Sequence, residues 1–231
     1  MSWESKTDYC GLAVNGKVVI KSSNMNRSGQ YLEKAGKSGA ICATKPYGTL
    51  DAPSCDYAVK GAHSFEAGDI KLGAVTTVDS KRYALQSVHY ACGADMEPEF
   101  SGTAQEIEAQ TDGKQRTFDV PAFDVSPDEC AEMVMSAATV GGVGCELTKV
   151  TMDASANVKP HTVNGVPVAS DCTMGHVTVQ VEILQTGGAK PTLEAETDWD
   201  ISSPLTCSDP DSDFPVWTAT LSKPLEYTAT A

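Results

Sequence analysis

One short motif in the chain has the residue types that bind a nucleotide phosphate. Gly36-Lys37-Ser38 matches the end of a phosphate-binding loop, in which a lysine and a hydroxyl group lie beside the phosphates. The full pattern needs a glycine five residues before Gly36, and Tyr31 stands there. No strand is expected before the motif and no helix after it. We therefore predict a basic turn in a loop rather than a nucleotide site.

Three aspartates at alternate positions, Asp209, Asp211 and Asp213, have the carboxylate spacing that opens a calcium-binding loop. An EF-hand loop would continue with glycine at position 214 and glutamate at 220, whereas the chain has Phe214 and Thr220. A looser calcium site, formed by loops of a β-sandwich, stays open beside the alternative of a solvated turn stiffened by prolines. We predict no metal ligand and no cofactor from this pattern.

The histidines share no common spacing, and the chain has no G-x-S-x-G motif of the kind that presents a nucleophilic serine. The order of residues along a chain cannot rule out a Ser-His-Asp triad, because triads occur in several orders. We nevertheless expect surface or half-buried histidines, no catalytic residue and no enzyme activity. The four histidines are His63, His89, His161 and His176.

Two glutamates and two tryptophans could act on sugars. Glu194 and Glu196 lie two residues apart on an expected strand, so they face the same way, whereas the carboxylates of a glycosidase flank a cleft from different elements. Trp199 and Trp217 could be stacking platforms for a carbohydrate. Their flanking residues favour packing in a core or at its edge, and this is what we predict.

The eight cysteines are spread along the chain without a C-x-x-C pair, which argues against a zinc knuckle or a thioredoxin-like site. The start of the sequence lacks the apolar run of a secretory signal. Reduced, mostly buried thiols are therefore the favoured prediction, with disulfides as the alternative. The positions are Cys10, Cys42, Cys55, Cys92, Cys130, Cys145, Cys172 and Cys207.

The charge of the chain restricts its partners. A formal net charge of −14 argues against a surface that grips nucleic acid or anionic lipid, because phosphate binding depends on lysine and arginine. Solubility alone explains this acidity equally well. No stretch reaches the roughly 20 apolar residues that cross a bilayer, so no membrane partner is expected.

Most of the chain has the composition and alternation of β-strands. Residues 177–183 alternate apolar and polar side chains, and after a turn at 187–189 the alternation resumes to Trp199. A looser copy of this hairpin is expected at 83–108, so the segments 83–108 and 177–201 could be an internal duplication. We predict a mainly β fold, a β-sandwich or β-barrel, as a single β-rich domain over residues 1–231.

Three segments are expected to depart from this β pattern. Residues 1–12 are predicted to form a short N-terminal arm or lead-in. Residues 22–53, rich in Ser, Asn, Gly and Lys, are predicted to be a long loop that could include one short strand near residues 40–44. One flanking α-helix is predicted at 127–138, because Ser126 and Glu129 form a capping box before it and two glycines follow it.

The C-terminal part of the chain resembles the end of bacteriophage tail-type structural proteins. The resemblance is carried by residues 187–195, by Trp199 and by the segments 204–211 and 215–220, about a fifth of the chain. It implies a β-sandwich or β-barrel protomer with a flanking helix that self-assembles into stacked rings, the tail tube that conducts DNA. The implied location is the virion, assembled in the host cytoplasm. The implied partners are further copies and other virion proteins, with DNA as cargo that does not stick.

A second hypothesis comes from another class of protein. An extracellular adhesin or carbohydrate-binding module with an immunoglobulin-like sandwich would use the two tryptophans and the loop Asp209–Asp213 as ligand and calcium sites. Its cysteines would be bridged, and the lack of an apparent leader argues against it.

Overall fold

The computed structural model describes residues 6–13, 16, 18–61, 63–94, 96–107, 116–125, 137–163 and 166–228. Most residues in these ranges belong to antiparallel strands, and none of them is in an α-helix. The predicted mainly β fold is therefore confirmed. No helix in these ranges is long and apolar enough to cross a membrane.

The largest sheet has nine strands. Eight follow one another in the order β1, β2, β7, β6, β11, β12, β15, β14, and β5 pairs with β6 beside this path. In chain order these strands are β1 (Val18–Ala35), β2 (Ile41–Val59), β5 (Val75–Val78), β6 (Lys81–Gly93), β7 (Met96–Ile107), β11 (Cys145–Val163), β12 (Val166–Gln185), β14 (Asp200–Cys207) and β15 (Val216–Pro224).

Three small sheets accompany the large one. They consist of β16 (Tyr227–Thr228) with β8 (Thr117–Asp119) and β4 (Lys71–Leu72), of β10 (Ala138–Gly141) with β13 (Thr192–Ala195), and of β3 (His63–Phe65) with β9 (Phe123–Val125). The rings of Phe65 and Phe123 stack with centroids 5.0 Å apart, and Phe65 also lies 5.9 Å from Phe100 of the large sheet. Small sheets thus cover one face of the large sheet in a sandwich-like arrangement.

Alternation along the strands decides which side chains enter this core. In β12 the side chains of Val177, Val179, Val181 and Ile183 are buried. The residues between them, Thr178, Gln180 and Glu182, point to the other face, as the sequence predicts. The large sheet therefore has one apolar face against the core and one face toward solvent.

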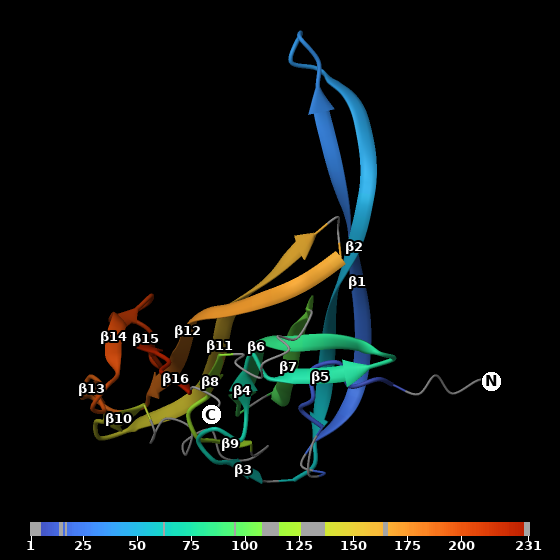
Figure 1. Cartoon of the computed structure of the whole chain (residues 1–231). Helices are drawn as coiled ribbons and strands as arrows, with labels where there is room; N and C mark the ends of the chain where they lie inside the picture. The colour runs from blue at the N-terminus through green and yellow to red at the C-terminus, as the bar shows by residue number, and fades with distance from the viewer. Residues whose placement is uncertain are drawn as a thin grey trace, which may run out of the picture.

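The long loop predicted at 22–53 is wrong. These residues form most of a hairpin in which β1 pairs with β2 from Val18↔Val59 to Ala35↔Ile41, with a turn at 36–40. Its outer part, residues 28–49, projects beyond the rest of the molecule (Figure 1) and is called the arm below. The side chains of the arm that are described are almost all exposed, and strands that face solvent need no apolar alternation. This explains why the sequence of the arm has the composition of a loop.

The clearer of the two predicted hairpins is also wrong in its pairing. Strands do occur at both of its segments, but β12 pairs with β11 and β15, while β13 pairs with β10. The looser copy is a true hairpin of β6 and β7. The two segments therefore do not share one pairing pattern, and the division of the chain into one domain stays a prediction.

The predicted helix at 127–138 lies outside the described residues except at its end. Its last residue, Ala138, begins strand β10, so the helix prediction is wrong there. Residues 6–13 are not an exposed arm but a lead-in segment packed on the sheet, since Cys10 and Leu12 are buried. We call residues 6–13 the lead-in.

Candidate functional site: a polar sheet face and a projecting arm

The solvent face of the large sheet carries a row of polar residues that reaches from one edge strand to the other. Adjacent members of this row are paired in register across eight strands. All of them are exposed or half-buried. From β1 to β14 the row is Ser22, Asp56, Ser101, His89, Asp153, Thr178, Ser222 and Asp200.

Two further rows run beside the first one. One comprises Asn24, Ser54, Thr103, Ser87, Ser155, His176 and Pro224, and the other Glu99, Ala91, Thr151, Gln180, Thr220 and Ser203, of which Ala91 is apolar and buried. The three rows together are called the polar face. Hydroxyl groups dominate it, carboxylates supply most of its charge, and it contains neither lysine nor arginine. Lys149, the next outward residue beyond the third row on β11, stands in register with Glu182.

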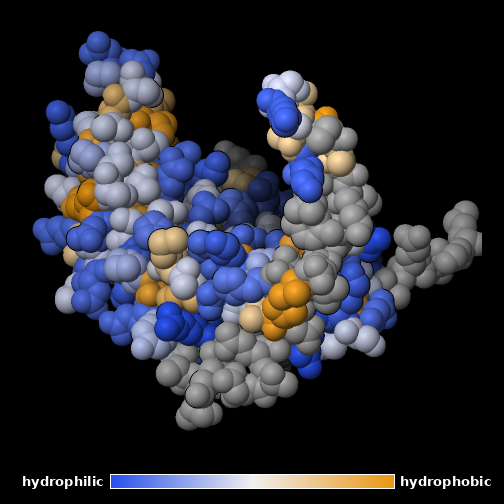
Figure 2. All heavy atoms as spheres, turned by 45° about the horizontal axis from the view of Figure 1, so that its top comes forward, coloured by the Kyte–Doolittle hydropathy of each residue, from blue (hydrophilic) through white to orange (hydrophobic). Residues whose placement is uncertain are grey.

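Side chains of the polar face bind one another. His89 Nδ1 lies 2.7 Å from Asp153 Oδ1, and the hydroxyls of Ser87 and Thr103 lie 2.6 Å apart. A shallow hollow of about 410 Å³ beside His89 is lined by carboxylates that include Asp56, and by Lys21. Figure 2 shows hydrophilic residues gathered in the hollow between raised parts of the molecule. Some of the polar side chains of this face therefore hydrogen-bond to one another rather than only to solvent.

The arm has the opposite charge to the rest of the chain. Residues 28–49 contain three lysines, Lys34, Lys37 and Lys45, against one acidic residue, Glu33, a formal charge of +2 in a chain of −14. Where its side chains are described they are almost all exposed. Ile41 at the tip is 57% exposed, so the arm offers apolar as well as basic contact area.

A cluster of charged residues braces the base of the arm. Asp51 is 1% exposed, and its carboxylate accepts hydrogen bonds from Arg27 Nε at 2.6 Å and Lys81 Nζ at 2.7 Å. Lys81 also lies 3.0 Å from Glu106, which in turn accepts the Asp51 backbone N–H at 2.9 Å. These contacts join both strands of the arm to β6 and β7.

The hydrogen bond from the Arg27 guanidinium lowers the pKa of Asp51, although burial opposes this effect, and Lys81 lowers the pKa further. Asp51 is therefore ionised in the folded protein at neutral pH. Asp51 contacts charged residues on three other strands, Arg27 on β1, Lys81 on β6 and Glu106 on β7. These contacts fix the orientation of the base of the arm as well as its attachment to the sheet.

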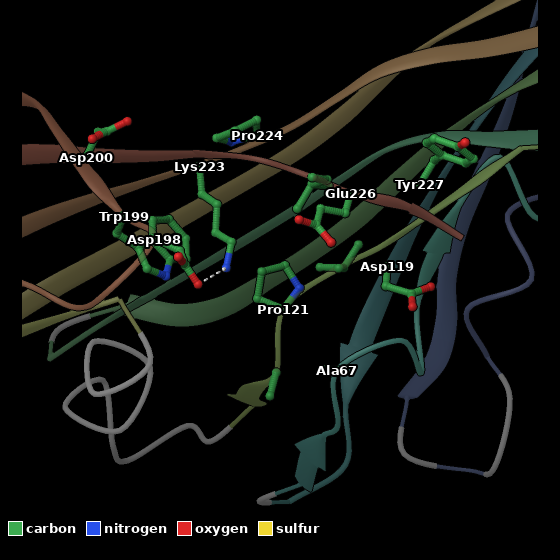
Figure 3. Close-up of a pocket in the computed structure, with 13 residues that line it drawn as sticks. Ala67, Asp119, Pro121, Asp198, Trp199, Asp200, Lys223, Pro224, Glu226 and Tyr227 are labelled. Carbon is green, nitrogen blue, oxygen red and sulfur yellow. Dashed lines mark ion pairs between the residues drawn. The ribbon is translucent and has the colours of Figure 1, made fainter. Parts of the chain in front are cut away.

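A cleft of about 850 Å³ opens at the other end of the sheet, between β15, β14 and the segment after β8. It combines two aromatic residues, Trp199 and Tyr227, with carboxylates. In Figure 3 Lys223 points to Asp198, 3.8 Å away, while Asp200 points away from both. The cleft could hold a small polar ligand against an aromatic edge.

The residues singled out in the sequence are not brought together into one site. Gly36-Lys37-Ser38 forms the predicted basic turn at the tip of the arm. Asp209, Asp211 and Asp213 lie exposed between β14 and β15. Within the part of the chain that is described, no three histidine, cysteine or acidic side chains gather as metal ligands would.

The histidines pair with carboxylates rather than with a nucleophile. His161 Nε2 lies 2.8 Å from Asp171 Oδ2 on the β11–β12 hairpin, His89 belongs to the polar face, and His176 is exposed. The side chain of His63 lies outside the described residues. Neither described histidine contact has the serine or cysteine partner that nucleophilic catalysis requires.

The tryptophans pack as predicted. Trp199 is 8% exposed, and Trp217 is half-buried against the core, with its Nε1 donating to Gln185 Oε1 at 2.8 Å. Glu194 and Glu196 are exposed on and just after β13, not across a cleft from each other.

Among the cysteines whose side chains are described, five are free thiols, as favoured from the sequence, and one is not. Cys92 is disulfide-bonded, and its partner is none of the free cysteines. The free ones are Cys10, Cys55, Cys145, Cys172 and Cys207.

Sequence reasoning did not identify the polar face, although its signal is present. The outward residues of β12 were recognised as an alternating polar set, but the register that aligns them with other strands depends on long-range pairing.

The comparisons with known proteins add no identification, because neither a protein-family model nor a curated protein matches the chain.

Proposed function

We propose that the chain is a virion structural protein that self-assembles into stacked rings of a phage tail tube conducting DNA. The observation that carries this proposal is the polar face, whose three rows hold no lysine or arginine and whose first row spans the large sheet from edge to edge. Lys21 and Lys149 lie beside the rows. Lining a lumen with this face would let DNA slide, because its carboxylates repel phosphate and outnumber the two lysines beside it.

The edges of the large sheet support assembly into a closed ring. Within the described part of the chain β1 pairs only with β2, and β14 pairs only with β15. Each edge strand therefore offers unpaired backbone groups to another copy. Head-to-tail contact between two different edges generates a ring when the rotation between neighbouring copies closes.

The arm supports contacts beyond one subunit. Its basic, exposed surface projects from an acidic protein, so electrostatic attraction favours another copy of the chain as its partner. Contact between the arm and a neighbouring copy would bury Ile41 and bring Lys37 toward carboxylates.

Electron microscopy of negatively stained protein, with light scattering for mass, tests assembly. Rings or tubes of uniform diameter are expected at high protein concentration. A matched variant lacks residues 31–47 and joins Gln30 to Gly48, which are register partners, through an Asn-Gly turn. This variant is expected to fold but to assemble poorly. A strictly monomeric full-length protein at high concentration in every salt condition would refute the proposal.

The lumen assignment has a test of its own. Thr103→Lys with Thr178→Lys adds cations to the polar face at outward positions, and Thr103→Gln with Thr178→Gln adds length without charge. The lysine variant is expected to bind DNA at low salt concentration and to release it as the salt concentration rises. The glutamine variant and the parent protein are expected not to bind DNA. Equal behaviour of the two variants in assembled particles would place the polar face outside the lumen.

A carbohydrate-binding module is the second candidate, and the cleft beside Trp199 favours it. Aromatic rings and carboxylates in one cleft fit the stacking and hydrogen bonding of a sugar. Titration of glycans, followed by tryptophan fluorescence, distinguishes the candidates: saturable quenching by a monomeric protein supports sugar binding, whereas unchanged fluorescence in ring-forming protein supports the tube.

A further inference from the structure

The lead-in is held on the sheet by one aspartate. Asp8 Oδ1 accepts the Gly11 N–H at 2.8 Å and the Tyr57 hydroxyl at 2.6 Å, and Asp8 Oδ2 accepts the Ala13 N–H at 2.8 Å. These bonds fold residues 8–13 into a compact turn over strands β2 and β7. The turn carries Cys10 into the core.

A glycine on β7 makes room for Cys10 beside Cys55. Gly102 pairs in register with Cys55, and a Cβ atom at Gly102 would lie only 3.3 Å from both Cβ and Sγ of Cys10. The Cys10 side chain thus fills the space that a side chain at 102 would occupy. Cys10 and Cys55 are 3% and 0% exposed, and the Cys55 thiol also lies 3.7 Å from the carbonyl oxygen of Thr7 in the lead-in.

The surroundings of Cys55 favour its thiolate. The hydrogen bond from the Cys10 thiol and the backbone N–H groups of Tyr9 and Cys10 lower the pKa of Cys55 to about 7, although burial opposes them. The same pairing raises the pKa of Cys10. Cys172, buried without such donors, has a pKa raised to about 11. A thiolate with a second thiol beside it is the arrangement that closes a disulfide.

We propose that Cys10 and Cys55 are a redox pair whose oxidation fastens the lead-in covalently to strand β2. The oxidant is a small disulfide such as oxidised glutathione. The Cys55 thiolate attacks one of its sulfurs and releases one glutathione thiolate, which takes up the proton lost by Cys55. Cys10, deprotonated in turn, attacks the Cys55 sulfur of the mixed disulfide and releases the second glutathione. The two cysteines lose two electrons, and oxidised glutathione gains them.

The lead-in controls access to this pair. Because it covers both sulfurs, glutathione reaches Cys55 only when residues 6–13 lift from the sheet. The bond then constrains the unfolded chain between positions 10 and 55, which stabilises the folded state. Oxidation is therefore expected to be slow, to raise Tm, and to slow proteolysis of the lead-in.

The test uses full-length protein with Cys145→Ser and Cys207→Ser, which removes the two half-buried free thiols. The protein is equilibrated in buffers of graded oxidised-to-reduced glutathione ratio, quenched in acid, alkylated and mapped by mass spectrometry. The expected result is a peptide linked through Cys10 and Cys55 that grows with the oxidised share, together with a higher Tm. Absence of this peptide in the most oxidising buffer, or linkage of either residue to another cysteine, overturns the proposal.

Single substitutions separate the two roles. With Cys10→Ser the reaction is expected to stop at a glutathione adduct on Cys55. Oxidation is then expected not to raise Tm. With Asp8→Asn the lead-in is held less firmly, so formation of the linked peptide is expected to be several-fold faster. If Tm of the Cys10→Ser protein still rises on oxidation, the stabilisation does not come from a Cys10–Cys55 disulfide and the proposal is refuted. Assembly is not needed for any of these readouts, so they are independent of the proposed tube.

Discussion

Replacing Asp51 by asparagine should weaken the brace at the base of the arm. The substitution keeps the shape of the side chain but removes the charge that Arg27 and Lys81 contact at 2.6 and 2.7 Å. Asparagine can still accept one hydrogen bond from either cation. The decrease in the free energy of unfolding is therefore mainly electrostatic, and its size depends on how well Arg27 and Lys81 are solvated.

The structure sets limits on that size. Removing one member of a buried ion pair costs about 3–5 kcal/mol, whereas a pair between exposed groups is worth about 0–1 kcal/mol. Asp51 is buried, but the side chains of Arg27 and Lys81 are 60% and 41% exposed, and Lys81 keeps Glu106 as a partner. Neither cation is left buried and unpaired. We expect the free energy of unfolding to fall by about 2 kcal/mol, which lies between these limits.

Urea unfolding followed by circular dichroism measures this change, and Tm should fall by about 4–8 °C. The control is Asp56→Asn, an exposed aspartate of the same strand on the polar face, which should change the free energy of unfolding by less than about 0.5 kcal/mol. If Asp51→Asn is as stable as Asp56→Asn, the charged cluster does not brace the arm and the reasoning is wrong.

The same residue predicts a pH dependence. Because the pKa of Asp51 is lowered in the folded protein, its contribution is fully present above the unfolded value of about 3.9 and is lost as pH falls through the folded pKa. The stability difference between the parent protein and Asp51→Asn should therefore be constant near neutral pH and shrink below about pH 4. A difference that persists unchanged in acid would mean that the charge of Asp51 is not its source.

Two further pairs of substitutions test the core and the close packing of the sheets by urea unfolding. Leu221→Ala, at a fully buried position, should cost about 2–5 kcal/mol, whereas Thr220→Ala on the polar face should stay within about 0.5 kcal/mol, and equal effects would contradict the assignment of faces. Gly175→Ala should cost about 1–3 kcal/mol, because a Cβ there would overlap the Phe118 ring, whereas Gly188→Ala meets no atom within 4 Å and should be near neutral. A tolerated Gly175→Ala would show that Phe118 can move away.

The sequence was a good guide wherever a strand has one dry and one wet face. The alternation of Val177 to Ile183 predicted both the strand and the core side chains, because a buried face selects apolar residues at every second position. The same reasoning failed for the arm, whose described side chains are almost all in solvent. Without a core to face, strand pairing leaves no periodic trace, and the abundance of Ser, Asn and Gly then resembles a loop.

The pairing of strands was the other part that sequence could not supply. The segment 177–183 and the segment beginning at Thr192 are close in sequence and both form strands, yet they join different sheets. Partners such as Cys55 and Gly102, or His89 and Asp153, are brought together from 47 and 64 residues apart. Neither the polar face nor the thiol pair exists until these partners are in register, so neither could be recognised in advance.

Strand β2 connects the features on which both proposals rest. Its inward side chains include Asp51 of the brace and Cys55 of the thiol pair, while Ser54 and Asp56 point outward into the polar face. Alternation along one strand thus places the anchor of the arm, the attachment of the lead-in and part of the polar face within a few residues. A change in how β2 sits on β7 would move all three together. Loosening the brace should therefore disturb assembly through the arm before it unfolds the sheet.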